Sequence, residues 1–322
     1  MTPATTTPPV PAPRRWHAVD GIVLLDKPAG LTSTQALQRV RRALRAEKAG
    51  HAGTLDPMAT GMLPLCFGQA TKACGVLLGQ RKAYRATVRL GVATDTGDAE
   101  GRVVTERDVP SLSAASVDDA LASLRGERTQ VPPMYSALKR DGRPLYEWAR
   151  RGETIERAPR PVTIERLDRV DVHGANVEVE LVCSKGTYVR VLAEEIAGRL
   201  GTVGHLTALR RLWVEPFAAS GLVTLDRVES DVAAEIAAPA WLQPSDAAFP
   251  GLPPIHLDET QSLHLRQGRT LAAPVDLPEA PRWRAYDAGH GFLGLVELGP
   301  DGRLRVVRLF IAGAGVPQGP ET

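Results

Sequence analysis

The spacing of apolar residues along the chain follows two different periods, which predicts a mixture of strands and helices. Residues 21–26 are a short apolar run that ends in the turn-forming sequence KPAG at 27–30, as expected for a strand. Apolar and polar side chains alternate from residue 84 to residue 90, and the alternation returns at 177–183. A period of two places every second side chain on the buried face of a strand.

Helical spacing occurs between these predicted strands. Thr32 or Ser33 can cap a helix whose apolar side chains, up to residue 44, recur with the 3.6-residue period. Ser113 can cap a second helix, and a third is predicted around residues 192–200. Strands and helices in this order suit several α+β folds, and the pattern alone does not choose among them.

The composition shifts after about residue 240. Five prolines stand at positions 239, 244, 250, 253 and 254. Beyond them, residues 294–298 and 304–311 read as short strands, with Pro-Asp-Gly at 300–302 as a hairpin turn signal. We therefore expect a second, small β-rich module at the C-terminal end.

Composition is that of a protein with a substantial core. Hydrophobic residues make up 43% of the 322 positions, but no apolar run reaches the roughly 18 residues that a membrane-spanning helix needs, so we expect no membrane segment. Residues 1–18 are rich in Pro and Thr and lack the apolar stretch of a signal peptide, which predicts a disordered leader. Cys66, Cys74 and Cys183 lack metal-ligand spacing, and we interpret them as reduced thiols in a cytoplasmic protein.

The net charge is only +2, but the basic residues are clustered. Residues 35–48 carry five basic side chains against one acidic, and residues 128–160 carry eight against four. Such clusters can follow a nucleic-acid backbone, although a solvated surface is the simpler reading of either one alone. The acidic turn at 94–101 is too short to be a calcium loop.

One segment carries candidate chemistry. The sequence GHAGTLDPMATG at residues 50–61 places Asp56 in a loop with three glycines, which tolerate backbone angles that other residues resist. Pro57 fixes its own φ and biases Asp56 away from helical angles. A carboxylate held in this way is positioned for a ligand.

This segment resembles the catalytic loop of the TruB family of tRNA pseudouridine synthases, and four further motifs follow the family's order. They are VLLDKPAG at 23–30, RKAY at 81–84, CSKGTYVR at 183–190 and LRRL at 209–212. The resemblance covers residues 19–217 well and the last 70 or so more weakly. It implies the isomerisation of uridine 55 in the TΨC loop of tRNA to pseudouridine, with tRNA as the partner, no obligatory protein partner and a monomeric enzyme.

The resemblance also implies the architecture. It points to the pseudouridine synthase fold, an α+β fold with a large mixed, mostly antiparallel sheet around a central cleft. Residues 19–248 would form this catalytic domain, with a thumb-like RNA-gripping segment at about 128–160. Residues 249–314 would form a PUA-like RNA-binding domain, followed by a tail at 315–322.

The family motifs assign expected roles to eight residues. Asp56 would be the nucleophile, with Arg190 as the cation that keeps it ionised and Tyr84 against the target base as a proton relay. The expected substrate-binding residues are His51, Tyr188, Leu209, Lys27 and Pro28. If the strand at 177–183 continues through Gly186, Tyr188 and Arg190 share one of its faces.

Pseudouridine formation breaks the N1–C1′ glycosidic bond, turns the base and joins C5 to C1′. No redox step or phosphate transfer occurs, so we expect no cofactor and no metal. Two other functions stay open: an RNA-binding or tRNA-folding protein in which catalysis is secondary, and a hydrolase that uses Asp56 and His51 as acid and base. A guide-RNA-dependent relative is a further alternative within the family.

Overall fold

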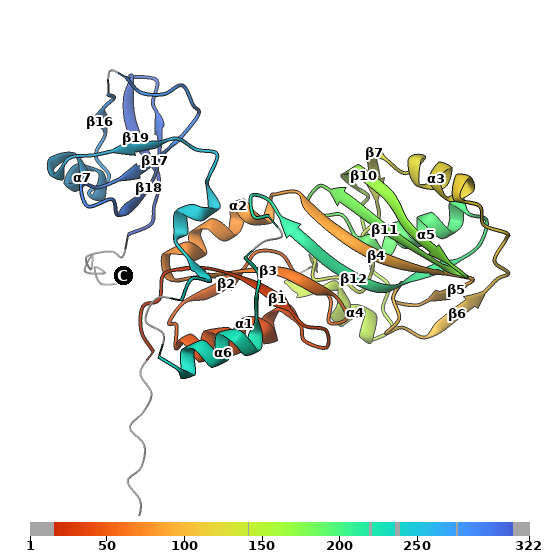
Figure 1. Ribbon diagram of the computed structural model, residues 1–322. Helices are drawn as coiled ribbons and strands as arrows, with labels where there is room; N and C mark the ends of the chain where they lie inside the picture. The colour runs from red at the N-terminus through yellow and green to blue at the C-terminus, as the bar shows by residue number, and fades with distance from the viewer. Residues whose placement is uncertain (1–15, 141, 219–220, 236–238, 275, 312–322) are drawn as a thin grey trace, which may run out of the picture.

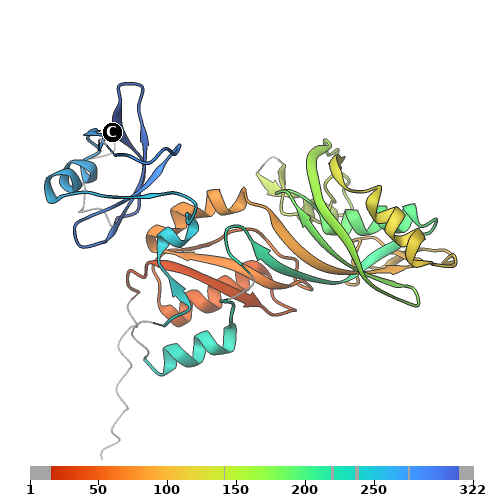
Figure 2. The ribbon, with the colours of Figure 1, turned by 45° about the horizontal axis from the view of Figure 1, so that its top comes forward.

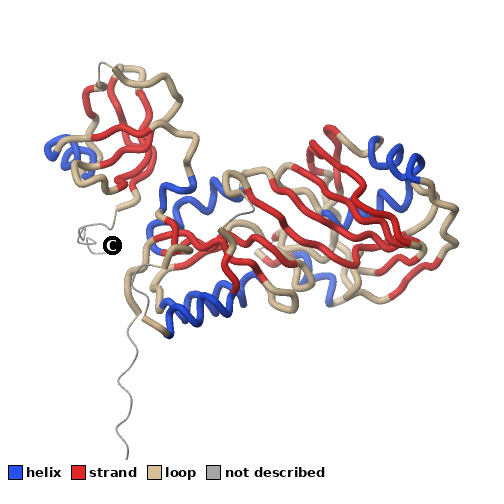
Figure 3. The backbone as a smooth tube through the Cα atoms, in the orientation of Figure 1, coloured by secondary structure: helices blue, strands red, loops and turns tan. Residues whose placement is uncertain are grey.

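The fold is described from a computed structural model (Figure 1). It describes residues 16–140, 142–218, 221–235, 239–274 and 276–311. The predicted tail at 315–322 and residues 1–15 of the predicted leader lie outside the described residues. A long sheet with helices on its faces forms most of the molecule, and a smaller sheet lies at one end of it, as the two groups of red strands in Figure 3 show.

The large sheet is mixed and mostly antiparallel, with the order β13-β1-β3-β12-β4-β11-β10-β7, while β14 pairs with β1 and β2 pairs with β3. Its strands are β1 (Gly21–Lys27), β2 (Ala49–His51), β3 (Thr60–Phe67), β4 (Lys82–Leu90), β7 (Gly126–Gln130), β10 (Arg160–His173), β11 (Asn176–Cys183), β12 (Gly204–Val214), β13 (Val223–Thr224) and β14 (Leu242–Gln243). Only the β1–β13 and β3–β12 pairs are parallel. The predicted fold class is confirmed.

Helices lie beside both sheets, as the two views in Figures 1 and 2 show. They are α1 (Ser33–Leu44), α2 (Cys74–Leu78), α3 (Ala114–Ala122), α4 (Leu145–Arg150), α5 (Val189–Arg199), α6 (Leu225–Ala233) and α7 (Glu259–Arg266), with 3-10 turns η1 (Gly68–Ala73) and η2 (Ser245–Ala248). Helix α1 packs beside α6, whereas α3 packs on β10 and α5 on β12. One apolar core joins α1, α3 and α5 to the sheet.

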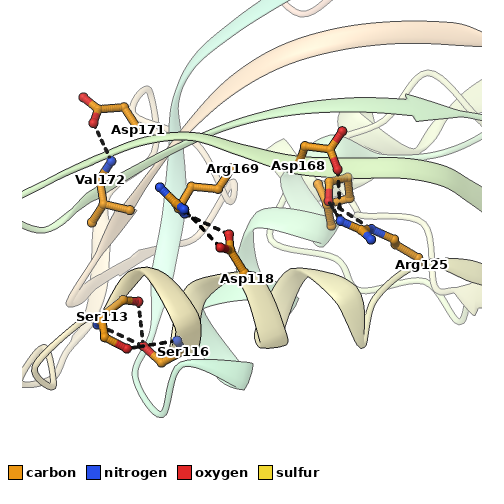
Figure 4. A network of polar contacts seen from close by, with 9 residues as sticks. Ser113, Ser116, Asp118, Arg125, Asp168, Arg169, Asp171 and Val172 are labelled. Atoms are coloured by element: carbon orange, nitrogen blue, oxygen red, sulfur yellow. Dashed lines mark hydrogen bonds and ion pairs between the residues drawn. The ribbon is translucent and has the colours of Figure 1, made fainter.

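Both predicted helix caps form. Thr32, not Ser33, caps α1, because its side chain accepts from the backbone N–H of Gln35. The backbone N–H of Thr32 donates to the Gln35 side chain, which completes a capping box. Ser113 caps α3 in the same way through Ser116. Figure 4 shows this cap and, beside it, the ion pair of Asp118 on α3 with Arg169 on β10.

The smaller sheet has the order β15-β17-β18-β19-β16 and its own apolar core. Its strands are β15 (Pro254–His256), β16 (Leu271–Ala272), β17 (Trp283–Tyr286), β18 (Phe292–Leu298) and β19 (Arg303–Leu309). Two further pairs of strands form two-stranded sheets of their own: β5 (Val92–Thr94) with β6 (Val103–Glu106), and β8 (Lys139–Arg140) with β9 (Arg143–Pro144). Phe310 packs edge-on against Phe249 at 5.6 Å and joins a cluster with residues of β1 and β3. This cluster attaches the small sheet to the large one.

The expected continuation of the strand at 177–183 is wrong. Strand β11 ends at Cys183, and Gly186 turns the chain with a φ of +82°. Tyr188 then becomes the N-cap of α5, so that Arg190 lies in the first turn of a helix. The turn at Gly186 breaks the pleat that would have placed both side chains on one strand face.

Candidate active site

A cavity of about 320 Å³ lies where several segments of the chain meet. The Asp56 loop, the start of β4, the start of α5 and the middle of β12 each contribute to its wall. The residues lining it are Gly53, Thr54, Leu55, Asp56, Leu78, Lys82, Tyr84, Ser136, Ala137, Leu138, Ser184, Gly186, Thr187, Tyr188, Val189, Arg190, Leu209 and Arg211. Of these described residues, only Asp56 carries a carboxylate. Five of the eight residues expected at the site line this one cavity.

The Asp56 loop is held from both sides. Leu55 donates its N–H to the hydroxyl of Ser33, which donates in turn to the Leu55 carbonyl. The carbonyl of Pro57 accepts from the backbone N–H of Gly30 at 2.8 Å and from Lys27 Nζ at 3.3 Å. The residues on either side of Asp56 are therefore bonded to the segment that follows β1, which fixes where its side chain points.

Arg190 forms an ion pair with Asp56. Its Nε lies 3.0 Å from Oδ2 and its Nη2 lies 3.4 Å from Oδ1, so the guanidinium and the carboxylate meet edge to edge. Arg190 also donates to the carbonyls of Thr96 and Tyr135. These three partners hold a side chain that is only 6% exposed, and this fixes the carboxylate at the cavity wall.

A second carboxylate stands behind Arg190. Asp98 Oδ2 lies 3.6 Å from Arg190 Nη1, and its Oδ1 accepts from the hydroxyl of Thr96 and the N–H of Glu100. The sequence did not reveal this role, because Asp98 lies in the acidic turn at 94–101, far along the chain from its partner Arg190. The available signal was Thr96, two residues earlier, because its hydroxyl can donate a hydrogen bond to the Asp98 carboxylate.

The pKa of Asp56 depends on two opposing effects. Burial raises it, while the charge of Arg190 lowers it; Asp98 raises it further, and Lys27 lowers it. The net result is a pKa above the usual value for aspartate. An ionised carboxylate at this position therefore depends on Arg190.

Tyr84, Leu209 and Tyr188 form the apolar side of the cavity. Tyr84 lies on β4 and Leu209 on the neighbouring β12, where Arg211 is paired with Tyr84 in the ladder. The N–H of Tyr188 donates to the Gln130 side chain at 3.0 Å. Burial raises the pKa of both tyrosines, so both hydroxyls keep their protons at neutral pH.

Two cationic side chains of the cavity wall were missed in the sequence. Lys82 belongs to the RKAY motif and Arg211 to the LRRL motif. The motifs predicted a role only for Tyr84 and Leu209, although all four residues line the cavity. Arg211 is 1% exposed and donates to the carbonyls of Met62 and Gly53. It therefore ties the Asp56 loop to β3.

Three expected residues do not line the cavity. Lys27 is buried, and its Nζ donates to the carbonyls of Pro28, Leu31 and Pro57; burial lowers its pKa to about 8, and Asp56 opposes that shift. Pro28 is exposed. His51 ends β2 half-buried, and burial together with Arg211 lowers its pKa, which leaves the ring neutral at pH 7.

The basic segment at 128–160 reaches the cavity. Its residues 136–138 form part of the wall, and the carbonyl of Tyr135 accepts from Arg190 at 2.6 Å. Beyond them it forms the β8–β9 hairpin and α4, where Arg150 lies over the ring of Tyr146 at 5.3 Å. Its position would let it contact a ligand that enters the cavity.

Three family models together match residues 41–249 and 253–310 of the chain. The N-terminal domain of the TruB family pseudouridylate synthases matches residues 41–189, and the tRNA pseudouridylate synthase B C-terminal domain matches residues 190–249. The C-terminal domain described as pseudouridine synthase II TruB matches residues 253–310. No helix of the described residues is long and apolar enough to cross a membrane.

Individual relatives agree with these matches. A protein of Aromatoleum aromaticum named tRNA pseudouridine synthase B is 53% identical over 90% of this chain and 92% of its own length. One of Burkholderia mallei with the same name is 49% identical over 96% of this chain and 100% of its own length.

Among solved structures, a Cbf5-Nop10-Gar1 complex matches with a TM-score of 0.68 at 23% identity, over 90% of this chain and 85% of that chain. At that identity the likeness shows the fold alone. The three matched domains and the identities near 50% show more: this chain belongs to the TruB family of pseudouridylate synthases.

Proposed function

We propose that this protein isomerises uridine to pseudouridine in tRNA, at position 55 of the TΨC loop, with Asp56 as the nucleophile. The observation that carries the proposal is the Asp56–Arg190 pair at 3.0 Å on the wall of the 320 Å³ cavity. The names of the relatives support tRNA as the substrate. As a monomer in the cytoplasm it would act on the TΨC arm without a cofactor.

The geometry supports a base that leaves its stack to react. Asp56 lies in a recess, so a stacked loop uridine does not reach it, and flipping costs a few kcal/mol that contacts in the cavity must offset. Tyr84, Tyr188 and Leu209 offer those contacts. Whether Asp56 attacks C1′, adds to the base or promotes a glycal intermediate, each path needs the ionised carboxylate that Arg190 favours.

The test replaces Asp56 with Asn, which keeps the size and removes the nucleophile. We expect wild-type protein, added alone to unmodified tRNA, to form pseudouridine at position 55, and Asp56→Asn to form none while it binds tRNA with similar affinity. Asp168→Asn, at an exposed ion pair, is the control and should turn over normally. Turnover by Asp56→Asn near the wild-type rate would remove the nucleophile assignment.

A second function rests on the basic segments. If the protein acts mainly by binding or folding tRNA, Asp56→Asn should retain the whole of its effect on tRNA structure. Chemical probing of tRNA folding with wild type and variant separates the two functions. Activity on naked tRNA also tests against a guide-RNA-dependent enzyme, because no other RNA or protein is present.

A further inference from the structure

Lys82 is a charged side chain inside the cavity for which the proposed function has no role yet. It lies on β4 two residues before Tyr84, so both side chains point to the same face of the strand. It is 7% exposed and lines the cavity. Its Nζ donates to the carbonyls of Gln80 at 2.6 Å and Leu78 at 3.2 Å. An ammonium has three donors, so one is left for a ligand.

The charge of Lys82 has no counterion. Neither Lys82 nor Arg211 beside it forms an ion pair with a carboxylate of the described residues, and Lys82 donates to two backbone carbonyls. Arg190, by contrast, is balanced by Asp56 and Asp98. Burying an unpaired cation costs free energy, so a buried cation without a counterion is commonly found where an anionic group binds.

We propose that Lys82 is a catalytic residue that stabilises the negative charge developing on the uracil ring during isomerisation. The inference rests on the proposed function, because it assigns a role to the wall of that same cavity. Charge of this kind is absent from the bound uridine and appears only as the reaction proceeds. A cation already fixed at the wall therefore favours the transition state over the ground state.

The electron balance explains why an anion forms. When the N1–C1′ bond breaks, its electron pair stays on N1 and spreads to O2 and O4, while the Asp56 carboxylate bonds to C1′. The uracil anion then uses a ring electron pair to join C5 to C1′, which releases the carboxylate. C5 afterwards loses its proton and N1 gains one. If Asp56 instead adds first to C6 of the base, the ring gains the same negative charge.

The surroundings of Lys82 make this role depend on pH. Burial lowers its pKa to about 8; Arg211 and Lys185 lower it as well, and Cys183 acts in the opposite direction. The ammonium therefore carries its charge at neutral pH and loses it as the pH rises through about 8. Lys27 has a pKa of about 8 too, but it lies outside the cavity wall.

The experiment compares wild type with Lys82→Met, which keeps the length and removes the charge, and Lys82→Arg, which keeps the charge. Single-turnover rates on saturating unmodified tRNA are measured from about pH 6 to about pH 10, with tRNA affinity in parallel. We expect Lys82→Met to be slower by about 100-fold with affinity within about threefold, as for other oxyanion donors. The single-turnover rate of Lys82→Arg should be at least about tenfold higher than that of Lys82→Met. The wild-type rate should fall above about pH 8, and Lys82→Arg should lack that fall.

The matched control is Lys185→Met, which removes a charge close to Lys82 but from an exposed residue outside the cavity wall. It should keep the wild-type rate at neutral pH, and its alkaline fall should move to higher pH because Lys185 lowers the pKa of Lys82. Weaker tRNA binding at an unchanged rate in Lys82→Met would show that Lys82 holds a phosphate, and would overturn the proposal. Equal losses in Lys82→Met and Lys82→Arg, or an alkaline fall that persists in Lys82→Arg, would overturn it as well. A wild type that forms no pseudouridine refutes the proposed function itself.

Discussion

Replacing Arg190 with Met should damage both the stability of the protein and the ionisation of Asp56. Arg190 joins Asp56 and Asp98, two carboxylates from separate segments, in a nearly closed environment. Without it, the Asp98 side chain, which is only 6% exposed, becomes a buried carboxylate with no cation among its described partners. Removing one partner from a buried pair typically costs about 3–5 kcal/mol, so we expect the free energy of unfolding to fall by that amount.

The same substitution should move the pH dependence of the reaction. Burial raises the pKa of Asp56, and Arg190 is the largest influence that opposes the rise. The proposed reaction needs the carboxylate, so its rate should fall as the pH drops through the folded-state pKa. With Arg190 absent that pKa is higher, and the loss of rate should begin at a higher pH than in wild type. Single-turnover rates across acidic and neutral pH measure the displacement.

Arg169→Met provides a control for both measurements. Arg169 on β10 pairs with Asp118 on α3 through two hydrogen bonds (Figure 4), and neither residue lines the cavity. Because that pair is solvated, its loss should leave the urea midpoint and the pH profile unchanged. An Arg190→Met protein with the wild-type urea midpoint and the wild-type acid limb would refute the argument.

Three further substitutions test other parts of the site. Asp98→Asn removes a charge that raises the pKa of Asp56, so the acid limb of the rate should move to lower pH; a shift in the opposite direction contradicts the assigned geometry. Tyr84→Phe should keep much of the rate if the ring only stacks, and should fail as badly as Tyr84→Ala, by roughly 10²–10⁴-fold, if the hydroxyl relays a proton. Changing Arg150 and Arg151 to Gln should weaken tRNA binding and flatten its salt dependence with little change in saturated turnover; parallel salt slopes and equal affinity would place both outside the interface.

The sequence predicted those parts of the fold that local physics decides. Thr32 and Ser113 cap their helices because their hydroxyls can accept from backbone N–H groups three residues on. The alternation around Tyr84 became β4, since one face of that strand is buried and the other is not. The turn signal at 300–302 lies between β18 and β19, which pair as a hairpin.

The remaining errors have causes that the spacing of apolar residues does not reveal. The path after Cys183 could not be read from alternation, because a single glycine with positive φ ended the strand and started α5. Asp98 was missed since its partner Arg190 is 92 positions away in the sequence, and a pattern search weighs only near neighbours. Lys82 and Arg211 were missed because a cation in a sequence is normally a surface residue, and only the folded chain reveals that these two are buried.

The close approach of β3 and β12 explains how these distant segments meet at one cavity. Gly61 has a φ of +96°, and a Cβ on it would lie 2.2 Å from the carbonyl oxygen of Arg211, so only glycine permits this parallel contact. The contact brings Arg211 next to the Asp56 loop, where it bonds the Gly53 carbonyl. The same strand presents Leu209 to the cavity and pairs with β4, which carries Lys82 and Tyr84. A glycine five residues after Asp56 thus sets how closely Arg211 approaches the Asp56 loop.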